Sequence, residues 1–410
     1  MNILDRFLKY VSIPTFSDSK SELNPSTKEQ FDLAKVLVEE LKELGLEVCF
    51  DEEHCYVYAC LKGNIDTAPK LGFIAHMDTS EDAKGNLIKP QIINNYDGND
   101  IIVGCKVIEV KNNPDLKKHI GKTIITSDGH TLLGADDKAG IAEIMMMLEH
   151  FVISNESHGD IYIAFTPDEE IGKGTKFFDF SKFEADFAYT VDGKDLGEIT
   201  YENFNAATVD ININGVTCHY GYAKDKMVNS MLIANKIINL IPKETPANTE
   251  KYEGYYHLEE INGSVTNTTL KYLIRDFDRD SFEMRKNKFK SIIEVFNAAY
   301  GNCISLKITD SYYNMRDVID DNKHLIVKAI KVMLKNRVES ISDPIRGGTD
   351  GAELAFKGLA CPNLGTGGHN FHTVYEYIAL EDMEKVADIL VDIVEEYAKV
   401  KEITKLVRKK

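Results

Sequence analysis

Short apolar runs that end in a histidine or an acid recur along the first half of this chain, and they restrict its fold more than any other feature. The runs and their closing residues are 71–75 with His76 and Asp78, 161–166 with Glu169 and Glu170, and 187–190 with Asp192. Helical patterns alternate with these strands, which indicates an α/β layer structure with a mainly parallel sheet. Polar residues at the carboxyl ends of such strands lie where ligands usually bind.

Hydrophobic periodicity supplies the expected elements of this first part. We predict helices over 26–44 and 139–150, and strands near 47–50, 57–61, 70–75, 124–126, 161–166 and 187–190. Periodicity is weak over 81–122, so most of that stretch is expected to be loop or irregular β structure.

The pattern changes at about residue 206 and changes back at about 311. Between them we predict a strand over 208–216, a helix over 227–241, strands over 255–261 and 264–275 joined by a tight turn at Asn262-Gly263, a helix over 280–300 and a strand over 304–309. That order, β-α-β-β-α-β, is ferredoxin-like. With 410 residues, more than one core is expected. We therefore predict a catalytic domain in two parts, 1–205 and 312–410, with an inserted lid domain over 206–311.

Composition and charge exclude several classes of protein. The net charge of −18 argues against a nucleic-acid partner, because such proteins gather a basic face. The apolar runs are far too short for a membrane span. Seven cysteines without paired spacing suggest reduced thiols, and the N-terminus lacks the pattern of a signal peptide. A cytoplasmic location is expected.

Each polar segment has an ordinary explanation when it is taken alone. Asp136 and Asp137 precede a helix, where one of them would serve as an N-cap, and adjacent acids such as Glu169 and Glu170 are commonly solvated. His372 follows a glycine-rich turn that reads as a surface loop. Taken together, two histidines and several acids at strand ends, without cysteine, are the ligand chemistry of a hydrolytic zinc or cobalt centre.

Longer motifs around these residues carry a resemblance to a known family. They are HMDTS at 76–80, TLLGADDKAG at 131–140, TPDEEIG at 166–172, IRDFDR at 274–279 and RGGTDG at 346–351. The chain resembles the peptidase T family of tripeptide aminopeptidases, within the two-zinc peptidases related to aminoacylases and glutamate carboxypeptidases. The resemblance covers nearly the whole chain and implies a two-zinc exopeptidase-like catalytic domain.

The resemblance also implies a role for each site residue. Of the two Zn²⁺, one would be held by His76 and Asp192 and the other by Glu170 and His372. Asp136 would bridge the two ions, and the peptide bond between Asp136 and Asp137 would be cis. Asp78 would orient His76, and Glu169 would be the general base. Substrate would be bound by His219 and Arg275 of the lid and by Arg346 of the catalytic layer, the two arginines holding its carboxylate.

One departure and two other functions accompany this reading. The family usually has proline after the lid histidine, whereas Tyr220 follows His219 here, which loosens the local backbone and leaves the aim of His219 open. Another enzyme of the same clan, such as an N-acyl amino acid deacylase or a dipeptidase, would use the same metals. A catalytically silent binding protein would have lost Glu169 or a ligand, and all are present. The expected partner is a small peptide, with a homodimer left open beside a monomer.

Overall fold

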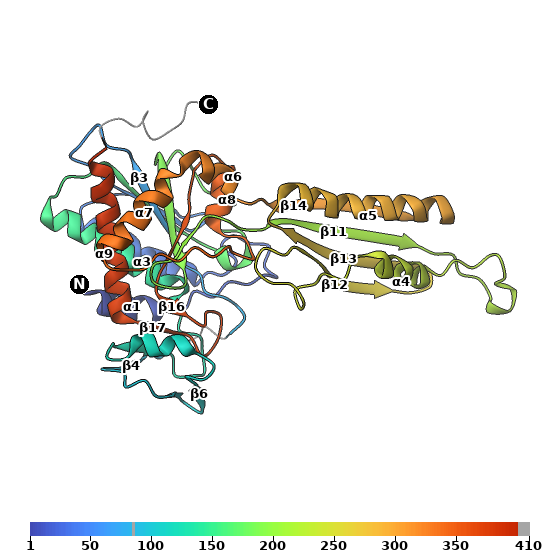
Figure 1. Cartoon of the computed structure of the whole chain (residues 1–410), viewed down its shortest axis with the longest axis horizontal. Coiled ribbons are helices and arrows are strands. Elements are labelled where there is room, and N and C mark those ends of the chain that lie inside the picture. The colour runs from blue at the N-terminus through green and yellow to red at the C-terminus, as the bar shows by residue number, and fades with distance from the viewer. Residues whose placement is uncertain (84–86, 401–410) are drawn as a thin grey trace. The chain divides into compact units, whose positions relative to one another are not determined.

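The computed structural model describes residues 1–83 and 87–400 (Figure 1), and its contacts separate two compact units. The first unit consists of Met1–Tyr201, Asp317–Asp343 and the described chain from Thr349 to residue 400. The second consists of Glu202–Arg316 and Pro344–Gly348. The short segment Pro344–Gly348, which carries Arg346, therefore belongs to the second unit and not to the catalytic layer in which the sequence analysis placed it.

A mixed sheet forms the centre of the first unit. Its strands, in spatial order, are β1 (Glu47–Asp51), β2 (Tyr56–Leu61), β8 (Ile161–Thr166), β3 (Leu71–His76), β9 (Phe187–Gly193), β15 (Asn363–Gly365) and β10 (Ile199–Thr200). Strands β8, β3, β9 and β15 run parallel, whereas β1, β2 and β10 are antiparallel to their neighbours. The predicted parallel arrangement thus holds for the middle of the sheet, and the β1–β2 hairpin makes one side antiparallel. The predicted α/β class is confirmed.

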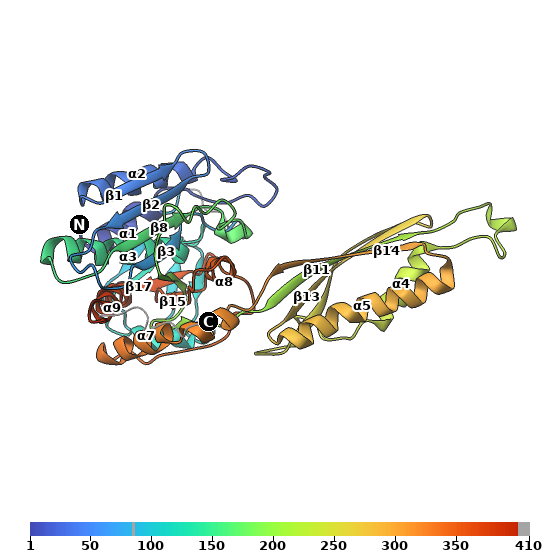
Figure 2. The ribbon, with the colours of Figure 1, turned by 90° about the horizontal axis from the view of Figure 1, so that it is seen from above.

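Helices α2 (Gln30–Glu43), α3 (Ala135–Ser154), α7 (His324–Lys335) and α8 (Asp350–Phe356) pack on strands of this sheet. The chain also forms α1 (Ile3–Val11), α6 (Arg316–Ile319) and α9 (Leu380–Ala398). Helix α3 packs on β3 and β9, with α1 and α9 against it (Figure 2). A Cβ on Gly140 would lie 2.0 Å from the carbonyl oxygen of Val191, so glycine allows α3 to approach β9 closely. Within residues 1–83 and 87–400, no helix is both long and apolar enough to cross a membrane.

A smaller sheet of the first unit flanks the loop that bears His372. Its order is β16 (Gly368–His369), β17 (Tyr377–Ala379), β7 (Ile124–Thr126) and β4 (Gln91–Ile93), and β5 (Ile101–Val103) pairs with β6 (Lys106–Ile108) beside it. Only β7 of these was predicted, because the short strands have little periodicity of their own. Their pairing joins distant segments, as the register of Tyr377 with Thr126 shows.

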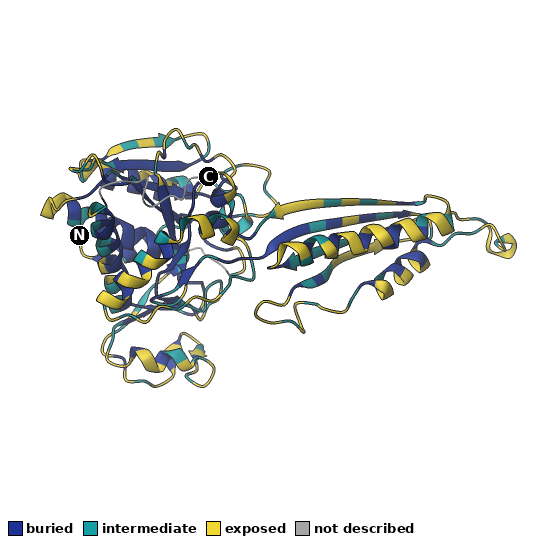
Figure 3. Ribbon diagram, turned by 45° about the horizontal axis from the view of Figure 1, so that its top comes forward, coloured by how far each residue is buried: buried dark blue, intermediate teal, exposed yellow. Residues whose placement is uncertain are grey.

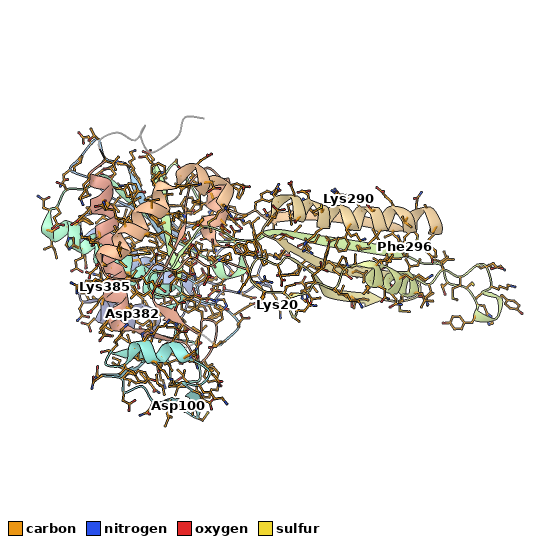
Figure 4. The ribbon with its side chains drawn as sticks, in the orientation of Figure 1. Lys20, Asp100, Lys290, Phe296, Asp382 and Lys385 are labelled. Atoms are coloured by element: carbon orange, nitrogen blue, oxygen red, sulfur yellow. The ribbon has the colours of Figure 1, made fainter. Side chains whose placement is uncertain are left out.

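The second unit is the predicted ferredoxin-like domain. Its elements are β11 (Asn205–Asn214), α4 (Ser230–Leu240), β12 (Tyr255–Gly263), β13 (Asn267–Asp276), α5 (Arg279–Tyr300) and β14 (Ile304–Tyr312). The antiparallel sheet has the order β12-β13-β11-β14, which confirms the predicted topology. Asp278 caps α5 by accepting the Ser281 N–H at 2.8 Å. Helix α5 carries both buried and exposed residues (Figure 3). Phe296 is buried in the core of this unit, whereas Lys290 is exposed (Figure 4).

The turn of the β12–β13 hairpin differs from the prediction. Asn262 and Gly263 are the last residues of β12, and the turn is closed by the Ser264 N–H, which donates to the Asn267 carbonyl at 2.7 Å. Gly263 pairs with Thr268, and a Cβ on it would lie 2.7 Å from Thr268 Oγ1. Glycine is present because of this close cross-strand contact and not because of a two-residue turn.

Candidate metal centre

The carboxyl ends of the parallel strands meet at one edge of the large sheet. His76 ends β3 and is in register with Thr166, the last residue of β8, so the residues that follow β8 emerge next to it. Asp192 lies near the end of β9, which pairs with β3 on its other side. Helix α3, packed on β3 and β9, brings Asp136 in its first turn to the same edge.

Asp136 lies between two imidazole rings. Its Oδ1 is 2.9 Å from His76 Nε2, and its Oδ2 is 3.2 Å from His372 Nε2. The same nitrogen of His76 lies 3.4 Å from Asp192 Oδ1, and that of His372 lies 2.9 Å from Glu170 Oε2. The structure therefore brings together the five residues that the sequence analysis named as ligands, with one carboxylate facing both halves of the cluster.

The donor atoms of this cluster are spaced as a metal ion requires. Within the part of the chain that the structure describes, two groups have ligand atoms within 4.8 Å of one another: His76, Asp136 and Glu170, and His76, Glu169 and Asp192. Glu170 Oε1 is buried and has no hydrogen-bond partner among the residues that the structure describes. Imidazole and carboxylate donors suit zinc and similar dications, and an unpaired buried carboxylate oxygen is costly without a cation. The residues therefore fit a pair of dications.

Burial of these carboxylates in one place raises most of their pKa values. Burial raises the pKa of Asp192 to about 6 and the pKa of Glu170 to about 7. Burial, followed by the charge of Asp192, raises the pKa of Glu169 well above its usual range. Burial would also raise the pKa of Asp136, but hydrogen bonds from the two imidazoles lower it. Several buried carboxylates this close together favour the binding of positive charge, because a cation offsets their mutual repulsion.

Asp78 organises the site from beneath. Its side chain is fully buried, and Oδ1 lies 3.3 Å from His76 Nδ1, which is also 3.0 Å from the Asp78 carbonyl oxygen. The same carboxylate accepts the N–H groups of Glu169 at 3.0 Å and Glu170 at 3.2 Å. Asp78 thus lies against His76, where the sequence analysis placed it, and also bonds the backbone that presents both glutamates, which the sequence did not reveal.

Asp168, which precedes Glu169, anchors this acidic turn on its other side. It has φ of 55° and is fully buried. Its carboxylate accepts the Ser26 N–H at 2.7 Å and the Gln30 Nε2–H at 2.7 Å. The turn that carries the two glutamates is therefore held by hydrogen bonds to Asp78 on one side and by those of Asp168 on the other.

The turn before α3 is not an ordinary helix cap. Gly134, with φ of 78°, occupies the N-cap position and has no side chain of its own with which to cap the helix. The peptide bond between Asp136 and Asp137 is cis, as the resemblance implied. Asp137 Oδ2 accepts the His76 N–H at 3.1 Å, and Glu376 accepts the Asp136 N–H at 3.2 Å. Asp136 is thereby left to face the imidazoles.

A nearby histidine, His369, lies three residues before His372 and makes different contacts. His369 Nε2 lies 3.1 Å from His119 Nε2, and the His369 ring stacks on Tyr377 with centroids 4.8 Å apart. His119 Nδ1 is in turn 3.1 Å from Oδ2 of Asp382 on α9 (Figure 4). His372, and not His369, lies at the acidic cluster.

The residues implied for substrate binding belong to the second unit. His219 is exposed, and its Nδ1 accepts the Gly221 N–H at 3.2 Å. Arg275 lies over the Tyr312 ring at 5.5 Å and donates from Nη1 to the carbonyls of Ile274 and Ala207. Within the described chain, its Nε and Nη2 have no hydrogen-bond partner, so they form a free donor edge.

Arg346 is engaged within its own unit. Its Nη1 donates to the carbonyls of Lys251 at 2.7 Å and Glu253 at 2.9 Å, and its Nη2 donates to Thr249 Oγ1 at 2.9 Å. The guanidinium also lies 4.9 Å from the Phe204 ring centroid. These contacts explain why the segment 344–348 joins the second unit.

Sequence reasoning missed Glu376 altogether. It is 1% exposed and accepts three backbone N–H groups of the turn that holds Asp136. Burial raises its pKa to about 7, against the lowering effect of those hydrogen bonds. An acid directly before the buried strand Tyr377–Ala379 was the available signal.

Known proteins match this chain over nearly its full length. The model of peptidase family M20/M25/M40 matches residues 127–396. The chain is 52% identical to peptidase T of Halothermothrix orenii, over 97% of this chain and 99% of that one, and 51% identical to peptidase T of Alkaliphilus oremlandii, over 97% and 100%. The crystal structure of aminopeptidase PepT from Bacillus cereus is similar, with a TM-score of 0.79 and 25% identity, over 97% of this chain and 98% of that one. This chain belongs to peptidase family M20/M25/M40 and, within it, to the peptidase T group.

Proposed function

We propose that this chain is a tripeptide aminopeptidase that works with two zinc ions. The observation that carries the proposal is the position of Asp136, whose two carboxylate oxygens each face a different imidazole. His76 and Asp192 would hold one ion, and Glu170 and His372 the other, with Asp136 shared between them. Membership of the peptidase T group supports the substrate class.

The chain's own residues then divide the work. When bound, the two dications would polarise the scissile carbonyl and make a nearby water more acidic. Glu169 accepts the proton of the attacking water and passes it to the leaving amine. Burial and the charge of Asp192 raise the pKa of Glu169, and the positive charge of bound dications would act in the opposite direction. Asp78 keeps His76 and the backbone of Glu169 in place during this transfer.

Selection of tripeptides needs an anchor for the far end of the substrate. A carboxylate is well matched by a guanidinium edge, and Arg275 offers one in Nε and Nη2. Arg346 has both Nη atoms bound to the 249–253 loop, so we propose that it shapes this loop and contributes to binding through it. His219 is proposed to assist at the developing oxyanion, and the exposed Tyr220 beside it leaves its backbone free to adjust.

The cellular setting is proposed on simpler grounds. All seven cysteines are free in the structure, which suits a reducing compartment, so we propose the cytoplasm. Sedimentation of the purified protein distinguishes a monomer from the homodimer that the sequence analysis left open.

A peptide panel with metal analysis tests the function. Purified enzyme is assayed with di-, tri- and tetrapeptides and one N-acetylated tripeptide, and zinc is measured on the same sample. We expect release of the N-terminal residue from the tripeptide, little cleavage of the acetylated form, and two zinc ions per chain. Preference for the acetylated peptide would identify a deacylase, and preference for dipeptides would identify a dipeptidase.

A variant of Glu169 tests the mechanism. Glu169→Ala is expected to lower turnover by ~10²–10⁴-fold, the range typical of a general base, while zinc content stays at two ions. Because Glu169 also stands among the residues spaced to hold a metal, zinc content decides between the two roles. Loss of one ion would make Glu169 a ligand, and turnover close to that of the parent would remove it from the mechanism.

A further inference from the structure

We propose that Glu376 is a positioning residue that locks the turn bearing Asp136 to the loop bearing His372, and so sets both cation sites together. The proposal rests on the dinuclear centre described above. It assigns the role to a side chain that contacts the cluster only through the backbone N–H of Asp136 and that none of the recognised motifs contains.

The contacts of Glu376 reach across the chain to one short turn. Its Oε2 accepts the N–H groups of Leu133 at 2.6 Å and Gly134 at 2.8 Å, and its Oε1 accepts the N–H of Asp136 at 3.2 Å. Its own N–H donates to the Thr373 carbonyl at 3.4 Å, one residue after His372. Glu376 therefore connects the backbones that carry two of the proposed ligands, through its carboxylate on the Asp136 side and through its own backbone N–H on the His372 side.

This turn needs an acceptor from elsewhere in the chain. Leu133 and Gly134 precede α3 and the backbone of Asp136 is not helical, so the regular hydrogen bonds of the helix do not serve these N–H groups. Glu376 supplies the acceptor that such buried donors need. Three donors converge on two oxygens, so a carboxylate satisfies them, whereas an amide would turn an NH₂ group toward an N–H.

The position of the second ligand, His372, follows that of the loop that carries it, because the exposed ring has few contacts of its own. The His372 side chain is 39% exposed, and outside the cluster its ring contacts Asp82, whose side chain is 69% exposed, at 3.3 Å. Its φ of 62° requires a tight turn, which the Glu376 contact with Thr373 helps to close. Movement of the loop that bears His372 would shift that ring away from Asp136 Oδ2. Movement of the turn that bears Asp136 would shift its carboxylate away from both imidazoles.

The chain provides a matched control in Glu143. It is a fully buried glutamate on α3, the helix that begins at the Asp136 turn. In the described part of the chain, neither of its carboxylate oxygens has a hydrogen-bond partner. Glu143→Gln therefore removes a buried acid without breaking a bond to the site. Glu376→Gln makes the same chemical change where three bonds converge.

Cobalt binding by the full chain tests the proposal. Co²⁺ is titrated into metal-free parent, Glu376→Gln and Glu143→Gln proteins, with calorimetry for affinity and visible absorption for coordination geometry. We expect Glu376→Gln to weaken both sites together by ~10–100-fold, as loss of residues that orient metal ligands does, and to change the absorption bands. Glu143→Gln should stay within about twofold of the parent, in keeping with a substitution remote from such features.

The outcomes distinguish failure of the role proposed for Glu376 from failure of the proposed dinuclear centre. A parent protein that binds fewer than two Co²⁺ refutes the dinuclear centre. A parent that binds two, together with parental affinity and spectrum in Glu376→Gln, overturns the role of Glu376 alone. If circular dichroism shows that Glu376→Gln is unfolded, Glu376→Asp takes its place, because it keeps the charge but withdraws it by one methylene. Parental Co²⁺ binding by Glu376→Asp then overturns the proposal.

Discussion

Replacement of Asp78 by asparagine is the most informative single change at the site, because one carboxylate serves three groups. Asp78 Oδ1 accepts the Glu169 N–H at 3.0 Å and faces His76 Nδ1 at 3.3 Å, while Oδ2 accepts the Glu170 N–H at 3.2 Å. Asparagine has nearly the same shape but only one acceptor oxygen. In either orientation of the amide, its NH₂ group would point at an N–H donor.

The magnitude follows from these contacts. A hydrogen bond to a charged group contributes about 1.5–3 kcal/mol, and at least one is lost. At about 1.4 kcal/mol per factor of ten, this corresponds to roughly 10–150-fold. The loss should appear in metal affinity, since His76 and Glu170 lose their orientation, and in turnover, since Glu169 does too. Measured effects of residues that orient metal ligands, about 10–100-fold, agree with this range.

The assay compares zinc affinity and tripeptide turnover in the parent and Asp78→Asn. Asp186→Asn is the control, because the Asp186 carboxylate accepts the Lys70 N–H at 2.8 Å just before β3, at the opposite end of the strand. We expect Asp186→Asn to keep parental zinc affinity and turnover. If Asp78→Asn binds two zinc ions with parental affinity and turns over within about threefold, the argument from its three contacts is refuted.

Three further predictions concern the bridge, the carboxylate anchor and pH. Asp136→Asn should weaken both metal sites, whereas His372→Ala should mainly empty one; full two-site occupancy of Asp136→Asn in a zinc titration would contradict the shared carboxylate. Arg275→Lys should raise KM for tripeptides and reduce their advantage over tripeptide amides, while Arg346→Lys should change that ratio less; equal hydrolysis of acids and amides by the parent would reopen the substrate assignment. Burial lowers the pKa of His324 to about 4, below its usual value near 6.5, so the unfolded chain binds the proton more readily and the stability gained above pH about 6.5 is lost as pH falls toward 4. Urea unfolding of the metal-free protein at pH 7 and pH 4.5 should show a lower free energy of unfolding at pH 4.5. The decrease should be smaller in His324→Gln, and an equal decrease in parent and variant would rule this residue out.

Local patterns in the sequence determined the elements and the chemistry of the site. Strands β7 and β8 were predicted with their observed bounds, because a compact apolar run between turns has few alternatives. The ferredoxin-like order followed from the succession of two periods, 2.0 and 3.6 residues, along one stretch of chain. The proximity of the acids and the histidine at the ends of parallel strands could also be predicted, since parallel strands bring their carboxyl ends to one edge of the sheet.

Tertiary structure decided which backbone groups each polar side chain would satisfy. Glu376 reaches the Asp136 turn over a separation of 240 residues, and Arg346 joins the second unit through carbonyls of residues 249–253. The turn residues Asn262 and Gly263 were drawn into β12 by the cross-strand fit of Gly263 to Thr268. These outcomes could not be predicted, because a buried N–H or C=O must find a partner but the sequence does not say which distant side chain will reach it. The residues that do the chemistry are visible locally, whereas the residues that aim them are chosen by the packing of the whole unit.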